Sequence, residues 1–124
     1  MRILFYDTKT YDRESFERII PEYKGITIDF LLTDISPRTV SLAKGYDAVC
    51  VFVASDLNGD IVRTLGKYGV KLILLRCAGF NNVDLTAAKE CGITVMRVPG
   101  SSPEAVAEHA MALLLTVNRR THRA

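Results

Sequence analysis

Short apolar segments alternate along this chain with segments of helical spacing. Five of the apolar segments are rich in valine, isoleucine, leucine and phenylalanine: Ile3–Tyr6, Ile26–Leu32, Ala48–Val53, Lys71–Leu75 and Ile93–Val98. Most are apolar at successive rather than alternate positions, which is typical of strands covered on both faces. The pattern therefore predicts five buried β-strands.

Helices are predicted between these strands. Phe16, Ile19 and Ile20 share one face of a helix at about residues 12–22. A short helix around Val40 is predicted to have Ser36 as its cap and Pro37 at its first position. Three more helices are predicted, from Leu57 to Leu65 with a stop at Gly66 or Gly69, from Val83 to Ala88 with a stop at Gly92, and from Ser102–Pro103 to the C-terminus.

Repeated strand–helix units predict an α/β fold, with a parallel sheet and helices on both faces. For five strands joined by right-handed crossovers, the flavodoxin-like strand order 2-1-3-4-5 is the expected one. Ligands of such sheets bind at the carboxyl ends of the strands, near the point where the strand order reverses. The candidate segments are therefore Asp7–Tyr11, Phe52–Asp56, Arg76–Asn82 and Pro99–Ser102.

The last predicted helix is apolar around nearly its whole circumference. Between Ala105 and Val117 its only polar residues are Glu108, His109 and Thr116. Such a helix is typically buried on all sides. We therefore expect residues 103–124 to pack against a second domain, a second copy of the chain, or both, with Glu108 and His109 on that interface. The alternative is a helix folded back over its own sheet.

Composition and charge limit the classes of function. The 124 residues predict one domain, and a net charge of +2 excludes nucleic acid or an anionic membrane as the main partner. Three cysteines without a CxxC pair, and no apolar stretch of about 18 residues, indicate a soluble, cytoplasmic protein with reduced thiols. The sequence has no GxGxxG dinucleotide fingerprint, no GxxxxGK[ST] P-loop and no GxSxG nucleophile elbow. Its histidines and cysteines have no spacing that suits zinc, so no metal site is predicted.

The segment from Arg76 to Asp84 is the most informative loop. Ala78 and Gly79 are small, and their backbone N–H groups could form an anion-binding nest, although an ordinary strand–helix turn is also compatible. Cys77 is interpreted as a buried structural thiol rather than a nucleophile. Asp7 at the end of the first strand suggests a phosphorylated receiver domain, but Phe52 stands where that class needs an acid on the third strand.

Eight segments, in order and over essentially the whole chain, resemble the NAD-dependent D-2-hydroxyacid dehydrogenases, and most closely their D-lactate dehydrogenase branch. They are Phe5–Lys9, Tyr11–Asp12, Gly45–Phe52, Arg76–Asp84, Val98–Pro99, Ser102–Pro103, Ala105–Leu115 and Asn118–Arg119. The resemblance implies a flavodoxin-like substrate-binding lobe at residues 1–101. It also implies a linking helix at residues 102–124 that leads toward an NAD-binding domain outside this sequence and contributes to a homodimer interface.

The resemblance also implies roles for individual residues. The backbone amides of Ala78 and Gly79 fall where the family binds the substrate carboxylate, and Phe52 falls where a residue walls the substrate pocket. Ser101 stands where the lactate branch often has a tyrosine. A smaller side chain there either widens the pocket or loosens the segment, and a wider pocket would admit a 2-oxo acid bulkier than pyruvate. The family's catalytic arginine, acid and histidine fall outside this chain, so no catalytic residue is assigned and the chain alone is expected to bind no NAD and to be inactive.

Two hypotheses remain at this point. The first is the substrate-binding lobe of an enzyme that interconverts a 2-oxo acid and a D-2-hydroxy acid with NAD. The second is a stand-alone dimeric binding module derived from that lobe.

Overall fold

The computed structural model describes residues 1–52, 55–76, 82–98, 100 and 102–123, with side chains as far as Arg119. Five strands, four α-helices and two 3₁₀ helices (η) follow one another in these ranges. In chain order they are β1 (Arg2–Phe5), α1 (Thr10–Ile19), η1 (Ile20–Glu22), β2 (Thr27–Phe30), η2 (Val40–Ala43), β3 (Ala48–Phe52), α2 (Gly59–Lys67), β4 (Leu72–Arg76), α3 (Leu85–Glu90), β5 (Thr94–Arg97) and α4 (Pro103–Arg123).

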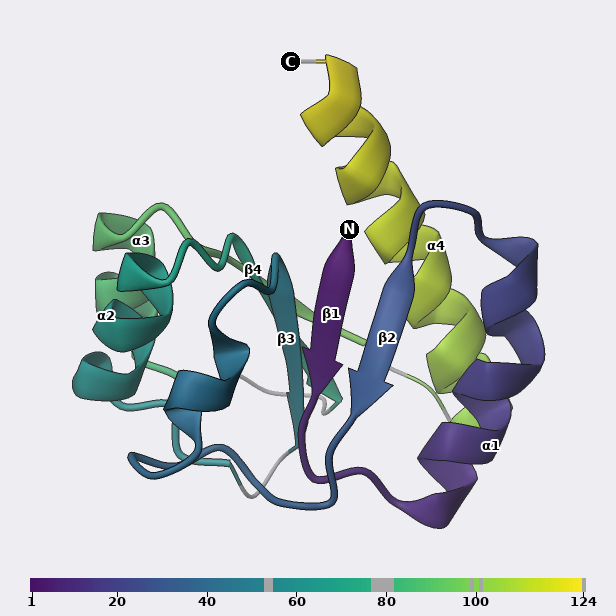
Figure 1. Cartoon of the computed structure of the whole chain (residues 1–124), viewed down its shortest axis with the longest axis horizontal. Coiled ribbons are helices and arrows are strands. Elements are labelled where there is room, and N and C mark those ends of the chain that lie inside the picture. The colour runs from purple at the N-terminus through teal and green to yellow at the C-terminus, as the bar shows by residue number, and fades with distance from the viewer. Residues whose placement is uncertain (53–54, 77–81, 99, 101, 124) are drawn as a thin grey trace.

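The five strands form one parallel sheet in the order β2-β1-β3-β4-β5 (Figure 1). In the register of the central pairs, Ile3 lies beside Ala48, and Ala48 lies beside Leu72. Each strand overlaps its predicted segment, so the predicted fold class and strand order are confirmed.

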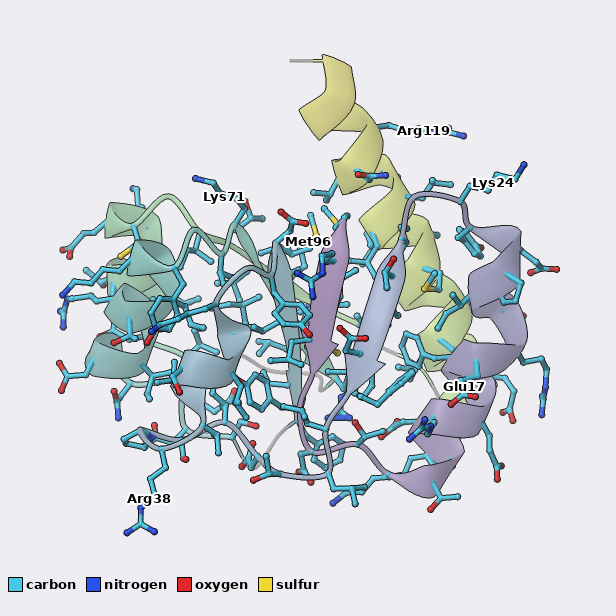
Figure 2. All side chains as sticks on the ribbon, viewed as in Figure 1. Glu17, Lys24, Arg38, Lys71, Met96 and Arg119 are labelled. Carbon is cyan, nitrogen blue, oxygen red and sulfur yellow. The ribbon has the colours of Figure 1, made fainter. Side chains whose placement is uncertain are left out.

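Helices cover both faces of this sheet, which explains the successive apolar positions of its strands. On one face, alternate residues such as Leu4, Val49 and Ile73 pack in one buried cluster with residues of η2, α2 and α3. On the other face, Ile3 and Leu72 pack with residues of α1 and α4. Charged side chains lie on the outside of the molecule, away from both buried clusters, as Figure 2 shows for Glu17, Lys24, Arg38, Lys71 and Arg119.

The boundaries of α2 and α3 follow from capping side chains and glycines. Asn58 accepts a hydrogen bond from the backbone N–H of Ile61, and Asp84 accepts one from that of Ala87. Beyond the C-terminal ends, Gly69 and Gly92 adopt φ of +86° and +70°, a conformation that suits glycine. Of the two stops proposed for α2, Gly69 is the one observed.

The predicted short helix around Val40 is observed as the four-residue 3₁₀ helix η2. Side-chain contacts hold the backbone before it in place. The Tyr6 hydroxyl donates to the carbonyl of Thr39 at 2.8 Å, and the Thr39 hydroxyl donates to that of Asp34 at 2.7 Å. Ser36 is not the cap of the observed helix, whose N-cap residue is Thr39; instead its Oγ accepts from the N–H of Arg38 in the turn before η2.

Helix α4 begins as predicted, with the Oγ of Ser102 accepting from the N–H of Ala105 at 3.1 Å. The expectation that this helix does not rest on its own domain is wrong for its first four turns. One face of it is buried against α1 and the sheet. The buried residues on that face are Ala107, Ala110, Met111, Leu114 and Asn118.

The opposite face of α4 is exposed, and this includes Glu108 and His109. The last turns extend beyond the amino-terminal end of the sheet (Figure 1). Over the ranges that the structure describes, no helix combines the length and apolarity needed to cross a membrane.

Candidate functional site

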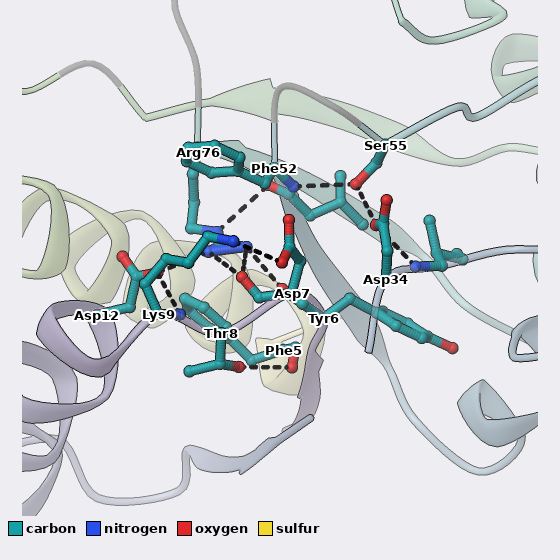
Figure 3. A network of polar contacts seen from close by, with 12 residues as sticks. Phe5, Tyr6, Asp7, Thr8, Lys9, Asp12, Asp34, Phe52, Ser55 and Arg76 are labelled. Atoms are coloured by element: carbon teal, nitrogen blue, oxygen red, sulfur yellow. Dashed lines mark hydrogen bonds and ion pairs between the residues drawn. The ribbon is translucent and has the colours of Figure 1, made fainter. Parts of the chain in front are cut away.

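The carboxyl ends of β1, β3 and β4 meet at one edge of the sheet, where the strand order reverses between β1 and β3. Figure 3 shows that side chains from the three candidate segments after these strands gather there. The prediction that these three segments lie together at the carboxyl edge is therefore confirmed, and the binding of a ligand there stays a prediction. Of the fourth candidate segment, Pro99 and Ser101 lie outside the described residues.

Arg76, the last residue of β4, joins these strand ends. Its Nη2 donates to the carbonyls of Tyr6 at 2.6 Å and Asp7 at 3.0 Å, and its Nε donates to that of Val51 at 3.4 Å (Figure 3). Its Nη1 forms an ion pair with Asp12 Oδ2 at 3.0 Å, and the two side chains are only 2% and 6% exposed. Because the partners come from β1, β3 and α1, one side chain fixes the relative positions of all three.

The sequence analysis named Arg76 only as part of a segment and gave no role to Asp12. One signal was available: a charged residue closes a strand whose other residues are all apolar. A charge at such a position needs a buried partner. The identity of that partner is not local in sequence, since Asp12 lies on another element.

The turn that follows β1 has an unusual backbone. Asp7 adopts φ of +49°, which is rare for a residue with a side chain, and its carbonyl points to Arg76. Lys9 Nζ donates to Asp7 Oδ1 at 2.9 Å. This hydrogen bond, together with the charge of Asp7, raises the pKa of Lys9, so Lys9 keeps its positive charge at neutral pH.

Phe52, the predicted pocket wall, is half-buried at the same edge and is held by its backbone. Its N–H donates to the Oγ of Ser55 at 3.2 Å, and that hydroxyl donates to Asp34 Oδ1 at 2.6 Å. The side chain of Asn82 donates to the carbonyls of Phe52 and Ser55 at 3.3 and 2.9 Å. The turn after β3 is thereby tied to the loop after β4.

The predicted carboxylate-binding residues Ala78 and Gly79, and Cys77 beside them, lie outside the described residues. Both flanks of that segment are described. On one side stands Arg76, and on the other the carbonyl of Asn82 accepts from the N–H of Leu57 at 2.8 Å. The segment therefore starts and ends at fixed points of the same edge.

Gly100 lies between Pro99 and Ser101, where the chain comes close to α4. A Cβ atom at Gly100 would lie 2.7 Å from Val106 Cγ2 and 3.0 Å from the backbone nitrogen of Val106. Contacts this short require glycine, so the path of the backbone toward α4 depends on this residue.

Glu108 and His109 do not belong to this edge, since they lie on the outward face of α4. A groove of about 450 Å³ adjoins this edge between the start of α1 and the end of β2. Lys9 lines it, together with Arg13, Glu14 and Glu17. Among the described residues, no three of His, Cys, Asp and Glu come together as metal ligands would. The carboxyl edge with Phe52, Lys9 and Arg76 is therefore the candidate site.

Cys50 in β3 gives a test of the core beneath this site. The thiol is fully buried, and burial raises its pKa to about 12. At pH 8 only about one part in ten thousand is then thiolate, the form that reacts. We expect iodoacetamide to alkylate the partly exposed Cys91 and to leave Cys50 unmodified, as measured by peptide mass spectrometry.

Unfolding in urea removes that protection and serves as the control, because both cysteines are then accessible. Equal labelling of Cys50 and Cys91 in the folded chain would contradict the burial of β3.

Comparisons with known proteins agree with this geometry. A family model described as D-isomer specific 2-hydroxyacid dehydrogenase, catalytic domain, matches residues 3–123. The chain is 47% identical to a D-lactate dehydrogenase of Escherichia coli over 124 residues, which are all of this chain and 37% of that protein.

Two solved structures show the same fold. The apo-structure of D-lactate dehydrogenase from Escherichia coli superposes with a TM-score of 0.76 at 46% identity, over 99% of this chain and 39% of that one. A D-isomer specific 2-hydroxyacid dehydrogenase from Lactobacillus delbrueckii ssp. bulgaricus, in an NAD-complexed form, gives a TM-score of 0.73 at 26% identity, over 93% of this chain and 35% of that one. The chain thus spans little more than a third of the length of these relatives.

Proposed function

Because the chain belongs to the D-isomer specific 2-hydroxyacid dehydrogenase family, we propose that it forms the part of such an enzyme that holds the 2-oxo acid or D-2-hydroxy acid. The observation that carries this proposal is the carboxyl edge. Phe52 and the turn around Asp7 lie there, and the flanks of residues 77–81 are fixed beside them. In a parallel sheet this is the edge where ligands bind.

In this proposal the chain positions the substrate. The Phe52 ring packs against the substrate's side chain, and the backbone N–H groups of Ala78 and Gly79 hold its carboxylate. Fixing both ends of a small acid orients its C2 atom and excludes water, which lowers the barrier by removing translational and rotational freedom beforehand. Ser101, in place of a larger side chain, leaves room for a 2-oxo acid bulkier than pyruvate.

Family members use NAD, and the described residues do not fit a dinucleotide at the β1–α1 turn. The N–H groups of Asp7, Thr8 and Lys9 are already bonded to Thr33, Leu31 and Asp12. A pyrophosphate at a strand–helix turn needs such N–H groups free and usually a glycine beside them. The role that we propose for this chain is therefore confined to the substrate.

The same proposal assigns the outward face of α4 to the rest of the protein. Glu108 and His109 are exposed there, although the buried face of the helix already rests on α1. A second subunit, the NAD-binding domain, or both would cover this face. Residues 1–101 would then form the substrate lobe and residues 102–124 the connection.

The test is a fusion in which this chain replaces the matching 124 residues of the Escherichia coli D-lactate dehydrogenase. We expect the fusion to reduce a 2-oxo acid with NADH, and the 124-residue chain alone to show no turnover. Oxidation of NADH at 340 nm measures both, with pyruvate and a branched 2-oxo acid as substrates.

The Escherichia coli enzyme itself is the control. Because of Ser101, we expect the ratio of kcat/KM for the branched acid to that for pyruvate to be higher in the fusion than in the control. A folded fusion that binds NADH but reduces neither acid contradicts the proposed function.

A further inference from the structure

The five N–H donors of Arg76 are all occupied within the chain. Nε donates to Val51, Nη1 to Asp7 and Asp12, and Nη2 to Tyr6 and Asp7. A guanidinium has five N–H groups and no acceptor. An arginine at the ligand-binding edge would ordinarily be a candidate for binding the substrate's carboxylate. This one has no donor left for a ligand.

The flat faces of the guanidinium are in contact with aromatic rings. Arg76 Cζ lies 4.2 Å from the ring centroid of Phe5 and 5.0 Å from that of Phe52. Both distances are within the range of a cation–π contact. Phe5 is fully buried in the core, whereas Phe52 is half-buried at the edge. Arg76 thus connects a fixed ring to the ring that faces the site.

Arg76 also holds the turn that carries Lys9. The left-handed backbone of Asp7 is unfavourable for a residue with a Cβ, and such conformations persist only where the surroundings enforce them. Here the Asp7 carbonyl accepts from both Nη atoms of Arg76. Lys9, bonded to the carboxylate of Asp7, lies with its Nζ 5.8 Å from the ring centroid of Phe52. Two cations therefore lie close to the Phe52 ring, Arg76 itself and Lys9, and Lys9 is carried by the turn that Arg76 holds.

We propose that Arg76 is a positioning residue of the substrate site, which sets the Phe52 ring and the Asp7 turn without touching the substrate. This rests on the proposed function. A lysine at position 76 keeps the charge opposite Asp12 but has three donors from one nitrogen, so it cannot serve carbonyls on two strands and stack on two rings. The pocket wall is then no longer held, while the reacting groups are unchanged.

The test is Arg76→Lys in the fusion protein and in the 124-residue chain. In the fusion, we expect the KM for the 2-oxo acid to rise about tenfold, which corresponds to about 1.4 kcal/mol of binding. The kcat and the KM for NADH stay within a factor of about two to three. Arg63→Lys, at an exposed arginine on α2, is the matched control and should leave all three unchanged.

A second readout does not depend on activity. In the 124-residue chain with labelled phenylalanine, Arg76→Lys should shift the aromatic NMR signals of Phe52 far more than those of Phe16, because the cation–π contacts of Arg76 among the described residues are with Phe5 and Phe52. Unmoved Phe52 signals, or moved signals with an unchanged KM for the acid, overturn the positioning role. A wild-type fusion that reduces no acid instead overturns the proposed function, whatever the spectra show.

If Arg76→Lys does not fold, the proposal is tested by adding oxamate, an unreactive analogue of pyruvate, to the wild-type fusion and recording its NMR signals. We expect oxamate to move the Phe52 signals and to leave the guanidinium signals of Arg76 in place. Displaced Arg76 signals would show a direct contact with the ligand and overturn the proposal.

Asp7→Gly adds a rescue, because glycine adopts φ of +49° without cost. We expect the double variant Asp7→Gly with Arg76→Lys to have a KM for the 2-oxo acid between those of Arg76→Lys and the wild type. A KM as high as that of Arg76→Lys would show that Arg76 does not act through the Asp7 turn.

Discussion

Replacing Asp12 with alanine should lower the free energy of unfolding of this chain by about 3–5 kcal/mol, the range for breaking a buried ion pair. Asp12 is 5% exposed, and its Oδ2 accepts from Arg76 at 3.0 Å and from the backbone N–H of Lys9 at 3.0 Å. Without the carboxylate, the guanidinium stays buried with its charge uncompensated. Urea unfolding followed by circular dichroism measures the change.

Glu17→Ala is the matched control on the same helix. Glu17 pairs with Arg13 in solvent, and such exposed pairs contribute only about 0.3–0.5 kcal/mol. The double variant Asp12→Ala with Arg76→Met should lose less stability than the sum of the two single changes, because no charge then remains buried alone. Additive losses would show that the two residues act separately.

Phe16→Ala should cost a similar amount, about 3–5 kcal/mol, because a large buried ring leaves a cavity that the surroundings fill only in part. Phe16 is 1% exposed, and its ring meets that of Phe5 edge-on with centroids 4.9 Å apart. It lies in the same buried cluster as Ala110, Met111 and Leu114 of α4. Loss of the ring should therefore also loosen α4.

Urea unfolding gives the total loss, and hydrogen exchange of the α4 amides shows where the fold opens. Tyr11→Ala, at an aromatic residue on α1 that is 48% exposed, is the control and should change the stability by less than about 0.5 kcal/mol. Unchanged exchange in α4 for Phe16→Ala would contradict the docking of this helix on α1.

The sheet could be predicted from sequence because each strand carries its own signal. Segments such as Ala48–Val53 are apolar on successive residues, and only a strand covered on both faces buries all of them. Caps and glycine stops are equally local, so Asp84 and Gly92 could mark the limits of α3. The parallel order then follows from general rules of chain connection.

Tertiary contacts that a local pattern does not contain decide the surroundings of η2 and the packing of α4, and the packing of α4 was misjudged for that reason. The carbonyls near Val40 bond to Tyr6 and to the side chain of Thr39, which no local pattern reveals. For α4, hydropathy shows that the helix is apolar, but not that one apolar face rests on α1 while Glu108, Ala112 and Thr116 remain exposed.

The candidate site likewise has one part that could be predicted from the sequence and another that could not. The place of Phe52 could be predicted, because a residue at the end of a buried strand must reach the carboxyl edge. The pairing of Arg76 with Asp12 could not, since 64 residues separate them in the chain. The left-handed Asp7 follows from that pairing and was equally invisible in the sequence.

That separation also sets an order of events during synthesis. At about 5–20 residues per second, Arg76 leaves the ribosome about 3–13 s after Asp12, and its contacts close one of the longer loops of the fold. Until then the carboxylate of Asp12 on α1 has no buried cation to pair with, and the ends of β1 and β3 are joined by backbone hydrogen bonds alone. The carboxyl edge formed by β1, β3 and β4 therefore cannot be completed before Arg76 has been made.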